Sequence, residues 1–213
     1  ALDARTGALK WEDIHPPRTT VHCCGPVNRG VAVDDGKVYL ATLDAALVAL
    51  DARDGHVVWQ TQVDDNTQAY GMTLPPVVVR GKVLVGVNGA EYGIRGHADA
   101  YDARTGRHLW RFYTVPSPDE GGWWGTWAET DPFGTSLKRD IAQEKRDSAK
   151  YPDAWKTGGG SIWQAPAVDT ALGLVLWNVN NPSPDIDGTV RPGDNLYTDC
   201  LIALDLETGK LKW

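Results

Sequence analysis

The sequence predicts an all-β protein, mainly because one phrase recurs along it. Eleven residues occur four times, at 1–11, 49–59, 100–110 and 203–213, each time as Ala, Leu or Tyr, Asp, two variable residues, Thr or Asp, Gly, three variable residues and Trp. Asp and Gly at this spacing are typical of a hairpin turn in which Gly takes the positive φ. The first three tryptophans lie about fifty residues apart, which indicates antiparallel sheets repeated side by side. The Trp fills the seam between neighbours. The pattern predicts a β-propeller.

The repeats divide the chain into blades. We expect residues 1–11 to close a preceding blade, 12–59 and 60–110 to form one four-stranded blade each, and 111–213 to form a third. The last interval is about twice as long as the others, yet it holds one set of strand signals, so we interpret it as one blade with two long insertions. Propellers usually close with about four blades or more, so the chain is expected to be part of a larger ring.

Composition argues against several classes of function. The net charge of −7 disfavours nucleic acid or an anionic membrane surface as a partner. A continuous apolar run long enough to span a membrane is absent from the sequence. Ten Trp accompany only two Phe, which fits a protein whose aromatic volume lies in the seams between blades.

The first two full blades show clear strand signals. Alternating apolar residues surround Gly-containing turns in 30–59 and again in 76–110. The second blade adds an insertion at 88–96, where Glu91 stands in an otherwise small and apolar setting. A carboxylate at the end of an inner strand is expected to point toward the central channel; the alternative is a solvated loop residue.

The third blade is interrupted by a first insertion at 111–160. Its Gly-rich run 121–127 contains three tryptophans, which are expected to cap the channel mouth or to pack beneath it, with a substrate lid as the alternative. A charged helix is predicted over 136–150, and Glu120 is expected to stay in water. Residues 157–163 are then expected to begin the inner strand of this blade.

That strand and the next supply candidate site residues. Ser161 and Trp163 share one face at the period of two residues. Trp163 is either a stacking surface for a planar ligand or another seam residue. Asn180 and Asn181 end the following strand, with their amide oxygens at the level of Glu91 in the blade before.

The cysteines leave several alternatives open. Cys23 and Cys24 are adjacent, and from the residues alone they are two reduced thiols, partners of other cysteines, or a strained disulfide with each other. Cys200 is the only other cysteine, so at most one long-range bridge can form. It stands at a predicted strand start and is expected to be a free, buried thiol. Arg29 lies in a Gly-bounded turn, where it either clamps a carboxylate or stays solvated.

Taken together, these motifs resemble the quinoprotein alcohol dehydrogenases, eight-bladed propellers that carry pyrroloquinoline quinone (PQQ) and a metal ion at the axis. The resemblance covers essentially the whole chain and implies about three blades of an expected eight. Its most specific part is Cys23-Cys24 followed by Arg29. In the family the two cysteines form a disulfide that is one wall of the PQQ pocket, and the Arg contacts the quinone. The resemblance therefore implies an oxidised pair and an oxidising compartment, the bacterial periplasm.

Further motifs imply the rest of the cofactor pocket. Asn88 stands in the family's loop that contacts PQQ carboxylates, although it replaces the more usual Ser. Trp163 matches the residue that stacks on the cofactor. The cofactor-binding positions that the resemblance implies besides the cysteines and the Arg are Thr73, Asn88, Gly89, Ala90, Ser161 and Trp163.

The resemblance also implies a metal site. Glu91 and Asn181 match the family's metal ligands, while Asn180 replaces the Gly that usually precedes the second of them. Carboxylate and amide oxygens are hard donors that suit Ca²⁺ or a lanthanide, and such an ion polarises the reactive quinone carbonyl. We assign no catalytic residue, because the family's Asp base is expected beyond residue 213.

The implied function is PQQ- and metal-dependent oxidation of a small alcohol to an aldehyde, with electrons passed to a cytochrome c or a similar acceptor. Three blades alone are expected to be inactive. The alternative is a non-catalytic propeller, a scaffold or sensor domain that binds partner proteins, because the repeated phrase occurs in such proteins too. The cysteine pair, the Ala-Glu insertion and the Gly-Gly-Gly-Ser-Ile-Trp segment favour the dehydrogenase.

Overall fold

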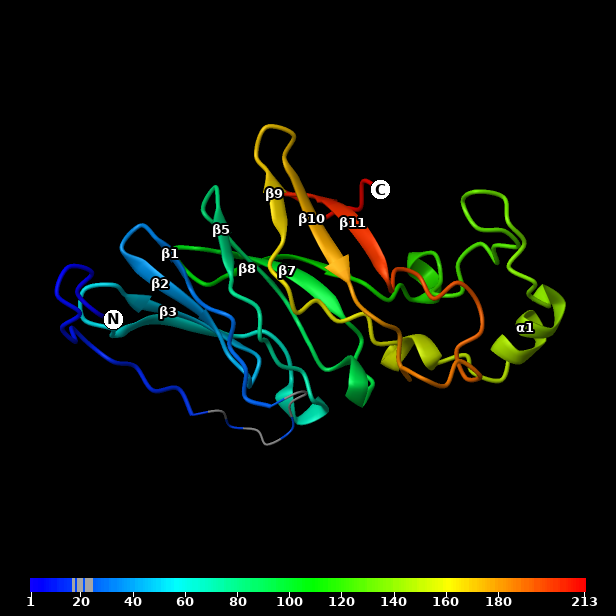
Figure 1. Cartoon of the computed structure of the whole chain (residues 1–213), viewed down its shortest axis with the longest axis horizontal. Coiled ribbons are helices and arrows are strands. Elements are labelled where there is room, and N and C mark those ends of the chain that lie inside the picture. Colours follow the sequence, from blue (N-terminus) through cyan, green and yellow to red (C-terminus); the bar gives the residue numbers. More distant parts are fainter. Residues whose placement is uncertain (17, 19–20, 22–24) are drawn as a thin grey trace.

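The computed structural model describes residues 1–16, 18, 21 and 25–213. Its strands form three antiparallel sheets that follow one another along the chain (Figure 1). In Figure 1 the sheets succeed one another from blue through green to red, and the charged helix stands at the end of the molecule opposite the N-terminus. The prediction of an all-β protein built from repeated antiparallel sheets is confirmed.

The strand bounds show that each sheet is a meander of consecutive strands. The first sheet contains β1 (Ala32–Asp34), β2 (Lys37–Ala41), β3 (Ala46–Asp51) and β4 (Val57–Gln62), in that order. The second contains β5 (Val77–Val79), β6 (Lys82–Gly86), β7 (His97–Asp102) and β8 (His108–Tyr113). The third contains β9 (Ala167–Asp169), β10 (Leu174–Val179) and β11 (Cys200–Asp205), in the order β11-β10-β9.

The third sheet has three strands where four were expected. An isolated antiparallel bridge from Leu204 to Leu211 occupies the fourth position beside β11. The same bridge joins Leu2 to Leu9 in the first copy of the phrase, so both copies form the same hairpin turn.

The tryptophans of the phrase form the seams between sheets. In the first three copies the indole Nε1 donates to a backbone carbonyl in the next copy of the phrase, over 3.0 to 3.2 Å: Trp11 to Ala52, Trp59 to Ala103, and Trp110 to Leu206. The same rings cover the glycine of that next copy. A methyl group at Gly106 would lie 2.6 Å from the Trp59 ring, so this position needs glycine for space as well as for its φ of +72°. Trp59 and Trp110 stand within β4 and β8.

Two apolar cores lie between neighbouring sheets. Tyr39 of β2 and Val83 of β6 belong to the core between the first and second sheets. Leu84 of β6 and Trp177 of β10 belong to the core between the second and third. Because successive side chains of a strand point to opposite faces, Val83 and Leu84 place β6 in both cores at once. The sheets therefore pack face to face in series.

Short helices occupy the connections. They are the 3₁₀ turns η1 (Asn66–Gln68), η2 (Ala90–Tyr92), η3 (Pro118–Glu120) and η4 (Ala154–Thr157), and the helix α1 (Ile141–Ser148). The helix is shorter than the predicted 136–150 because the preceding residues bond elsewhere: the Leu137 amide donates to the Glu129 carbonyl. The Asp140 side chain then caps α1 by accepting from the Gln143 amide. Among the described residues, none of the helices has the length and apolar character to cross a membrane.

Residues 157–163 correct the sequence prediction. They form no regular strand. Instead, Gly159 makes isolated bridges to Arg95 and to Pro182, and the Ile162 amide donates to the Val87 carbonyl. A methyl group at Gly96 would lie 2.1 Å from the Gly160 carbonyl oxygen. The glycines thus let this segment run in direct contact between the second and third sheets, which a strand in one sheet does not do.

Candidate functional site

A cavity of about 290 Å³ lies where loops of all three sheets meet. The loops come from before β1, before β5, after β6, before β9 and after β10. In Figure 1 these connections gather along the lower edge, and the β1–β2, β5–β6 and β9–β10 turns lie along the upper one. Six of the predicted site residues line the cavity, with Val27 and Asn180 added: Val27, Arg29, Thr73, Asn88, Glu91, Trp163, Asn180 and Asn181.

Arg29 and Trp163 come together on one side of the cavity. The Arg29 guanidinium carbon lies 4.9 Å from the centroid of the Trp163 ring, which is cation–π geometry. The backbone amide of Arg29 donates to the Thr73 carbonyl over 3.0 Å, and its guanidinium reaches the same oxygen at 3.5 Å. The segment before β1 is therefore pinned to the segment before β5. Trp163 lines this cavity and is none of the three tryptophans that seal the seams between sheets.

Two polar side chains of the cavity carry buried oxygens without partners. Thr73 and Asn88 are 3% and 7% exposed, and among the described residues neither the Thr73 hydroxyl nor Asn88 Oδ1 has a hydrogen-bond partner. A buried polar atom left unpaired costs about 1–3 kcal/mol. A polar ligand in the cavity offsets this cost, so these orphaned atoms fit a pocket that binds a polar group.

Gly89, Ala90 and Ser161 do not line the cavity, although Gly89 and Ala90 stand between two residues that do, Asn88 and Glu91. A side chain at Gly89 would place its first carbon 2.3 Å from the Ala69 carbonyl oxygen, and its φ is +124°. The Ala90 amide donates to the Ser161 hydroxyl oxygen over 2.9 Å. Ser161 is 2% exposed, so this bond fixes the start of η2 against the third sheet. The three residues therefore position the loop that carries Glu91.

Glu91 and Asn181 both line the cavity, as the metal hypothesis requires. Glu91 stands in the first turn of η2, exposed and without an ion-pair partner in the described part of the chain. Asn181 is half-buried, and its amide nitrogen donates to Asp185 Oδ1 over 2.6 Å. A carboxylate and an amide oxygen at one cavity are hard donors that fit Ca²⁺ or a lanthanide.

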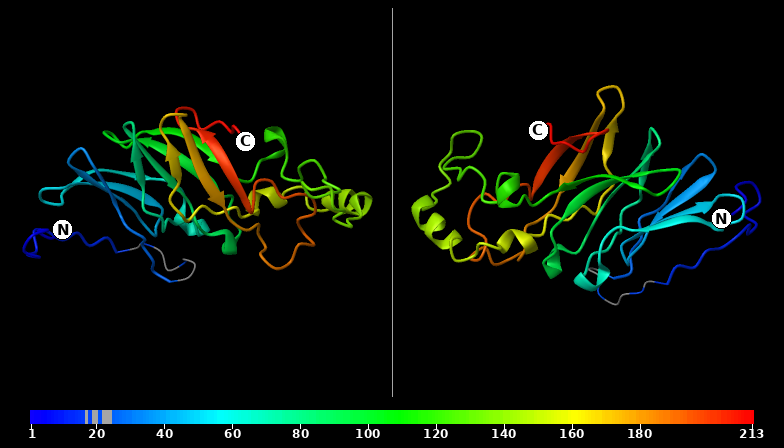
Figure 2. Two further views of the ribbon diagram at one scale, coloured as in Figure 1. Left: turned by 45° about the horizontal axis from the view of Figure 1, so that its top comes forward. Right: turned by 180° about the vertical axis from the view of Figure 1, so that it is seen from behind.

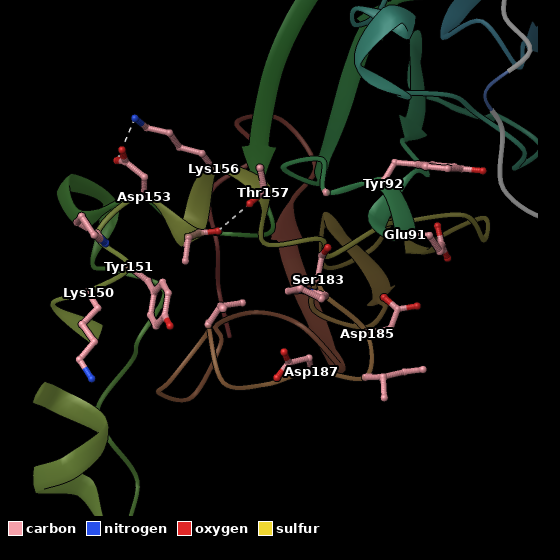
Figure 3. A pocket seen from close by; sticks show the side chains of 16 residues that line it. Glu91, Tyr92, Lys150, Tyr151, Asp153, Lys156, Thr157, Ser183, Asp185 and Asp187 are labelled. Atoms are coloured by element: carbon pink, nitrogen blue, oxygen red, sulfur yellow. Dashed lines mark hydrogen bonds and ion pairs between the residues drawn. The ribbon is translucent and has the colours of Figure 1, made fainter. Parts of the chain in front are cut away.

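A larger hollow of about 1060 Å³ adjoins the cavity and shares Glu91 with it. Figure 3 shows Glu91, Tyr92 and Asp185 on one side of this hollow and Tyr151 on the other. The η4 turn and the loop after β10 supply most of the remaining lining. Glu91 thus stands between an inner, polar cavity and an open outer one.

The long insertion braces this region. Trp123 is fully buried, and a methyl group at Gly158 would lie 2.9 Å from its ring, so this indole packs beneath the site. The Arg95 guanidinium lies over the Tyr113 ring, at 3.7 Å, and pairs with Glu120. Burial raises the pKa of Glu120, but hydrogen bonds from Ser117 and the Arg95 charge outweigh it and hold the pKa below its ordinary value. Glu120 thus remains exposed, as expected, while it is paired with Arg95.

The cysteine predictions have separate outcomes. Cys23 and Cys24 lie outside the described residues. Cys200 begins β11, as expected, but it is exposed rather than buried. Alternation does not explain the difference, because Cys200 shares its strand face with Ile202, which is buried in the core between the second and third sheets. Cys200 is instead the first residue of β11 and follows the exposed Asp199, so it lies at the margin of that core.

Sequence reasoning missed Val27 and Asp185 as parts of the site, and it gave Asn180 no binding role. Val27 is an ordinary apolar loop residue, and no local pattern separates it from others. Asn180 carried a signal, because it repeats the amide of Asn181 immediately before it. Asp185 acts only through its contact with Asn181, which the sequence cannot show.

The chain is similar to known dehydrogenases along its whole length. The model of the family described as the β-propeller domain of glucose, ethanol and alcohol dehydrogenases (PQQ) matches residues 1–213. The quinohemoprotein alcohol dehydrogenase ADH IIB of Pseudomonas putida is 39% identical over 219 residues, which cover 100% of this chain and 30% of that protein. The lanthanide-dependent methanol dehydrogenase of Methylorubrum extorquens is 35% identical over 218 residues, covering 100% of this chain and 35% of that protein.

Solved structures agree with the sequence matches. The crystal structure of the quinohemoprotein alcohol dehydrogenase from Comamonas testosteroni matches with a TM-score of 0.78 and 37% identity, over 100% of this chain and 31% of that one. BamB from Moraxella catarrhalis matches with a TM-score of 0.53 at 18% identity over 100% of this chain and 44% of that one, a likeness of fold alone. The predicted β-propeller class is thereby confirmed. The chain spans about a third of the length of the dehydrogenases it matches. Because the family model covers every residue, this protein belongs to the PQQ-dependent alcohol dehydrogenase family, in the β-propeller domain.

Proposed function

We propose that the protein carrying this chain oxidises a small alcohol to an aldehyde with PQQ and a Ca²⁺ or lanthanide ion. The observation that supports the proposal is the single cavity that gathers six of the predicted cofactor and metal positions from three sheets. A non-catalytic scaffold has no need of a polar cavity with a carboxylate, amide oxygens and an arginine at one point. The likeness to BamB concerns the fold only and adds nothing to that alternative.

The residues of the cavity divide between two roles. PQQ is a planar tricarboxylate that, when bound, accepts the two electrons an alcohol gives up on becoming an aldehyde. Trp163 offers a flat face, and Arg29 beside it offers a fork of donors that matches a carboxylate. The unpaired Thr73 hydroxyl and Asn88 oxygen offer further polar contacts at the wall. These four residues would hold and orient the cofactor.

Glu91 and Asn181 would hold the ion. Glu91 brings a full negative charge, and the short bond to Asp185 keeps the amide nitrogen of Asn181 turned away so that its oxygen is left to bind. A cation at this position would act as a Lewis acid on a neighbouring carbonyl. We assign no catalytic base to these residues. The acceptor that we propose for the electrons is a cytochrome c or a similar carrier, and the compartment is the periplasm.

The test uses the protein at its full natural length, freed of cofactor and metal. PQQ is added with Ca²⁺ or La³⁺, and affinity is measured by calorimetry while dye-coupled oxidation of a short primary alcohol is followed separately. Charge-assisted hydrogen bonds contribute about 1.5–3 kcal/mol, so Arg29→Met is expected to weaken PQQ binding roughly tenfold or more. Arg104→Met is the matched control, because Arg104 is exposed in a hairpin turn.

Two results would contradict the proposal. One is failure of the wild-type protein to bind PQQ with either ion. The other is equal PQQ affinity in the Arg29 and Arg104 variants, which would show that PQQ does not bind in this cavity.

A further inference from the structure

The two metal ligands implied so far leave the ion under-coordinated. Ca²⁺ takes about six to eight oxygen ligands in proteins. Glu91 supplies at most two oxygens and Asn181 one, so protein, cofactor or water must complete the shell. The cavity contains one more amide that no role described above uses, the side chain of Asn180.

The hydrogen bonds of Asn180 fix which way its amide faces. Its backbone N–H and its side-chain Nδ2 both donate to the Ser161 carbonyl oxygen, over 2.9 and 3.0 Å. A carbonyl oxygen only accepts, so the NH₂ end of the amide must face Ser161 and Oδ1 must face away from it. No residue in the described part of the chain donates to that oxygen.

Asn181 is arranged in the same way. Its Nδ2 donates to Asp185 Oδ1 over 2.6 Å and to the Pro182 carbonyl over 3.2 Å, and both partners only accept. The strand β10 ends at Val179, so the two asparagines stand in irregular backbone, where strand alternation does not force neighbours to opposite faces. Both line the cavity that Glu91 also lines.

We propose that Asn180 is a third protein ligand of the ion, contributing its Oδ1 beside Asn181 Oδ1 and the Glu91 carboxylate. The Ser161 carbonyl is the group that orients it. This inference rests on the proposed function, because it takes the cavity to be a metal site. It gives the chain two adjacent amide ligands with independent anchors, one on the segment before β9 and one on the loop after β10.

Terbium luminescence tests the inference without PQQ or substrate. Tb³⁺ is a lanthanide whose emission is sensitised by a nearby indole, here Trp163, and its lifetimes in H₂O and D₂O report how many waters it binds. In the quinone-free protein, Asn180→Ala is expected to weaken Tb³⁺ binding about tenfold and to add about one bound water, because water replaces a lost oxygen ligand. Asn178→Ala is the matched control: Asn178 lies on β10, exposed, with its amide on Gln164.

The outcomes separate this inference from the metal site itself. An unchanged water count in Asn180→Ala overturns the inference, as does an effect that appears only when PQQ is present, which would assign Asn180 to the cofactor. In either case a large loss of affinity in Glu91→Gln leaves the metal site standing. If Glu91→Gln also binds Tb³⁺ as the wild type does, the metal site fails and this inference fails with it. Melting curves of the metal-free variants check that each one is folded.

Discussion

At the scale of single residues, backbone carbonyls organise the cavity as much as side chains do. The Thr73 carbonyl holds both the backbone and the guanidinium of Arg29, and the Ser161 carbonyl holds both the backbone and the amide of Asn180. Each carbonyl belongs to a different sheet connection from the residue it holds. A change of side chain at Thr73 or Ser161 therefore leaves these anchors in place, whereas a shift of the backbone there would move the site.

The cysteines give a prediction at this scale. In the unreduced protein we expect an alkylating reagent to modify Cys200 alone, because Cys23 and Cys24 are proposed to be joined. Partial desolvation of its sulfur and the nearby Asp199 raise the pKa of the exposed Cys200 thiol, so its modification should speed up as the pH is raised and thiolate forms. Mass analysis of intact protein gives the count. Three modified cysteines without reductant would rule out the pair; three after reduction is the expected control.

At the scale of elements, the repeated phrase forms a hairpin turn and also leaves the space into which a tryptophan packs. Its Gly must take a positive φ and must also leave room for the Trp of the preceding copy, as Gly106 does for Trp59. Gly81, in the same sheet, has only the first of these requirements. Its φ is +71°, but the space around it is open.

A pair of variants measures the packing demand. Gly81→Ala is expected to cost about 1–2 kcal/mol of unfolding free energy, because alanine is strained at positive φ. Gly106→Ala should cost that amount plus about 1–3 kcal/mol for overpacking against the Trp59 ring, which must move. Urea unfolding of both variants gives the difference. Equal losses of unfolding free energy in the two variants would show that the Trp59 ring moves aside at no cost and that its packing does not hold the two sheets together.

The sequence predicted the elements that are encoded locally and missed those set by distant contacts. The repeated phrase predicts the sheets and the seams between them, because its turn and strand signals lie within eleven residues. Residues 157–163 were predicted to be a strand, yet their bridge partners, Arg95 and Pro182, lie in the connections of two different sheets. Glu120 is exposed, as expected, yet its ion pair with Arg95, from the loop after η2, was not predicted. The site follows the same rule: its residue types were predictable, but the anchors of Asn180 and Asn181 were not.

At the scale of the whole molecule, the three sheets pack in series and leave their site-bearing loops along one edge (Figure 2). The position of the loops therefore depends on how firmly neighbouring sheets hold each other. Between the first and second sheets, apolar packing is joined by a charged network. Its members are Asp64, which follows β4, His97 and Asp99 of β7, and His108 and Arg111 of β8.

His97 is the centre of this network. It is fully buried, and its two ring nitrogens lie 2.5 Å from Asp99 and 3.1 Å from Asp64. Burial disfavours the charged imidazolium, but the two carboxylates outweigh this and raise the pKa of His97 above 6.5. Arg111 bridges the same two carboxylates, at 2.7 and 2.8 Å. For Asp99, burial is again outweighed, here by His97 and its other partners, and the pKa of Asp99 is lowered. Two cations and two anions therefore hold β7 and β8 to the chain that leaves the first sheet.

The network predicts a pH dependence of stability. A raised His97 pKa stabilises the fold fully below the ordinary value of 6.5, and this contribution is lost as the pH rises from there through the folded pKa. The lowered pKa of Asp99 acts oppositely: its contribution is present above the ordinary value of 3.8 and is lost as the pH falls through the folded pKa. Stability from the network should therefore be greatest from about pH 4 to 6.5.

His97→Gln tests this dependence, with His56→Gln, in an exposed turn, as the control. Breaking a buried ion pair costs about 3–5 kcal/mol, so His97→Gln should lower the unfolding free energy by that order at pH 6. The deficit should narrow as the pH is raised, because the wild type then loses the charge that the variant already lacks. Urea unfolding at pH 6, 7.5 and 9 gives the three values. A deficit that stays constant across this range would mean that His97 is neutral in the folded protein and that Arg111 alone balances the two carboxylates.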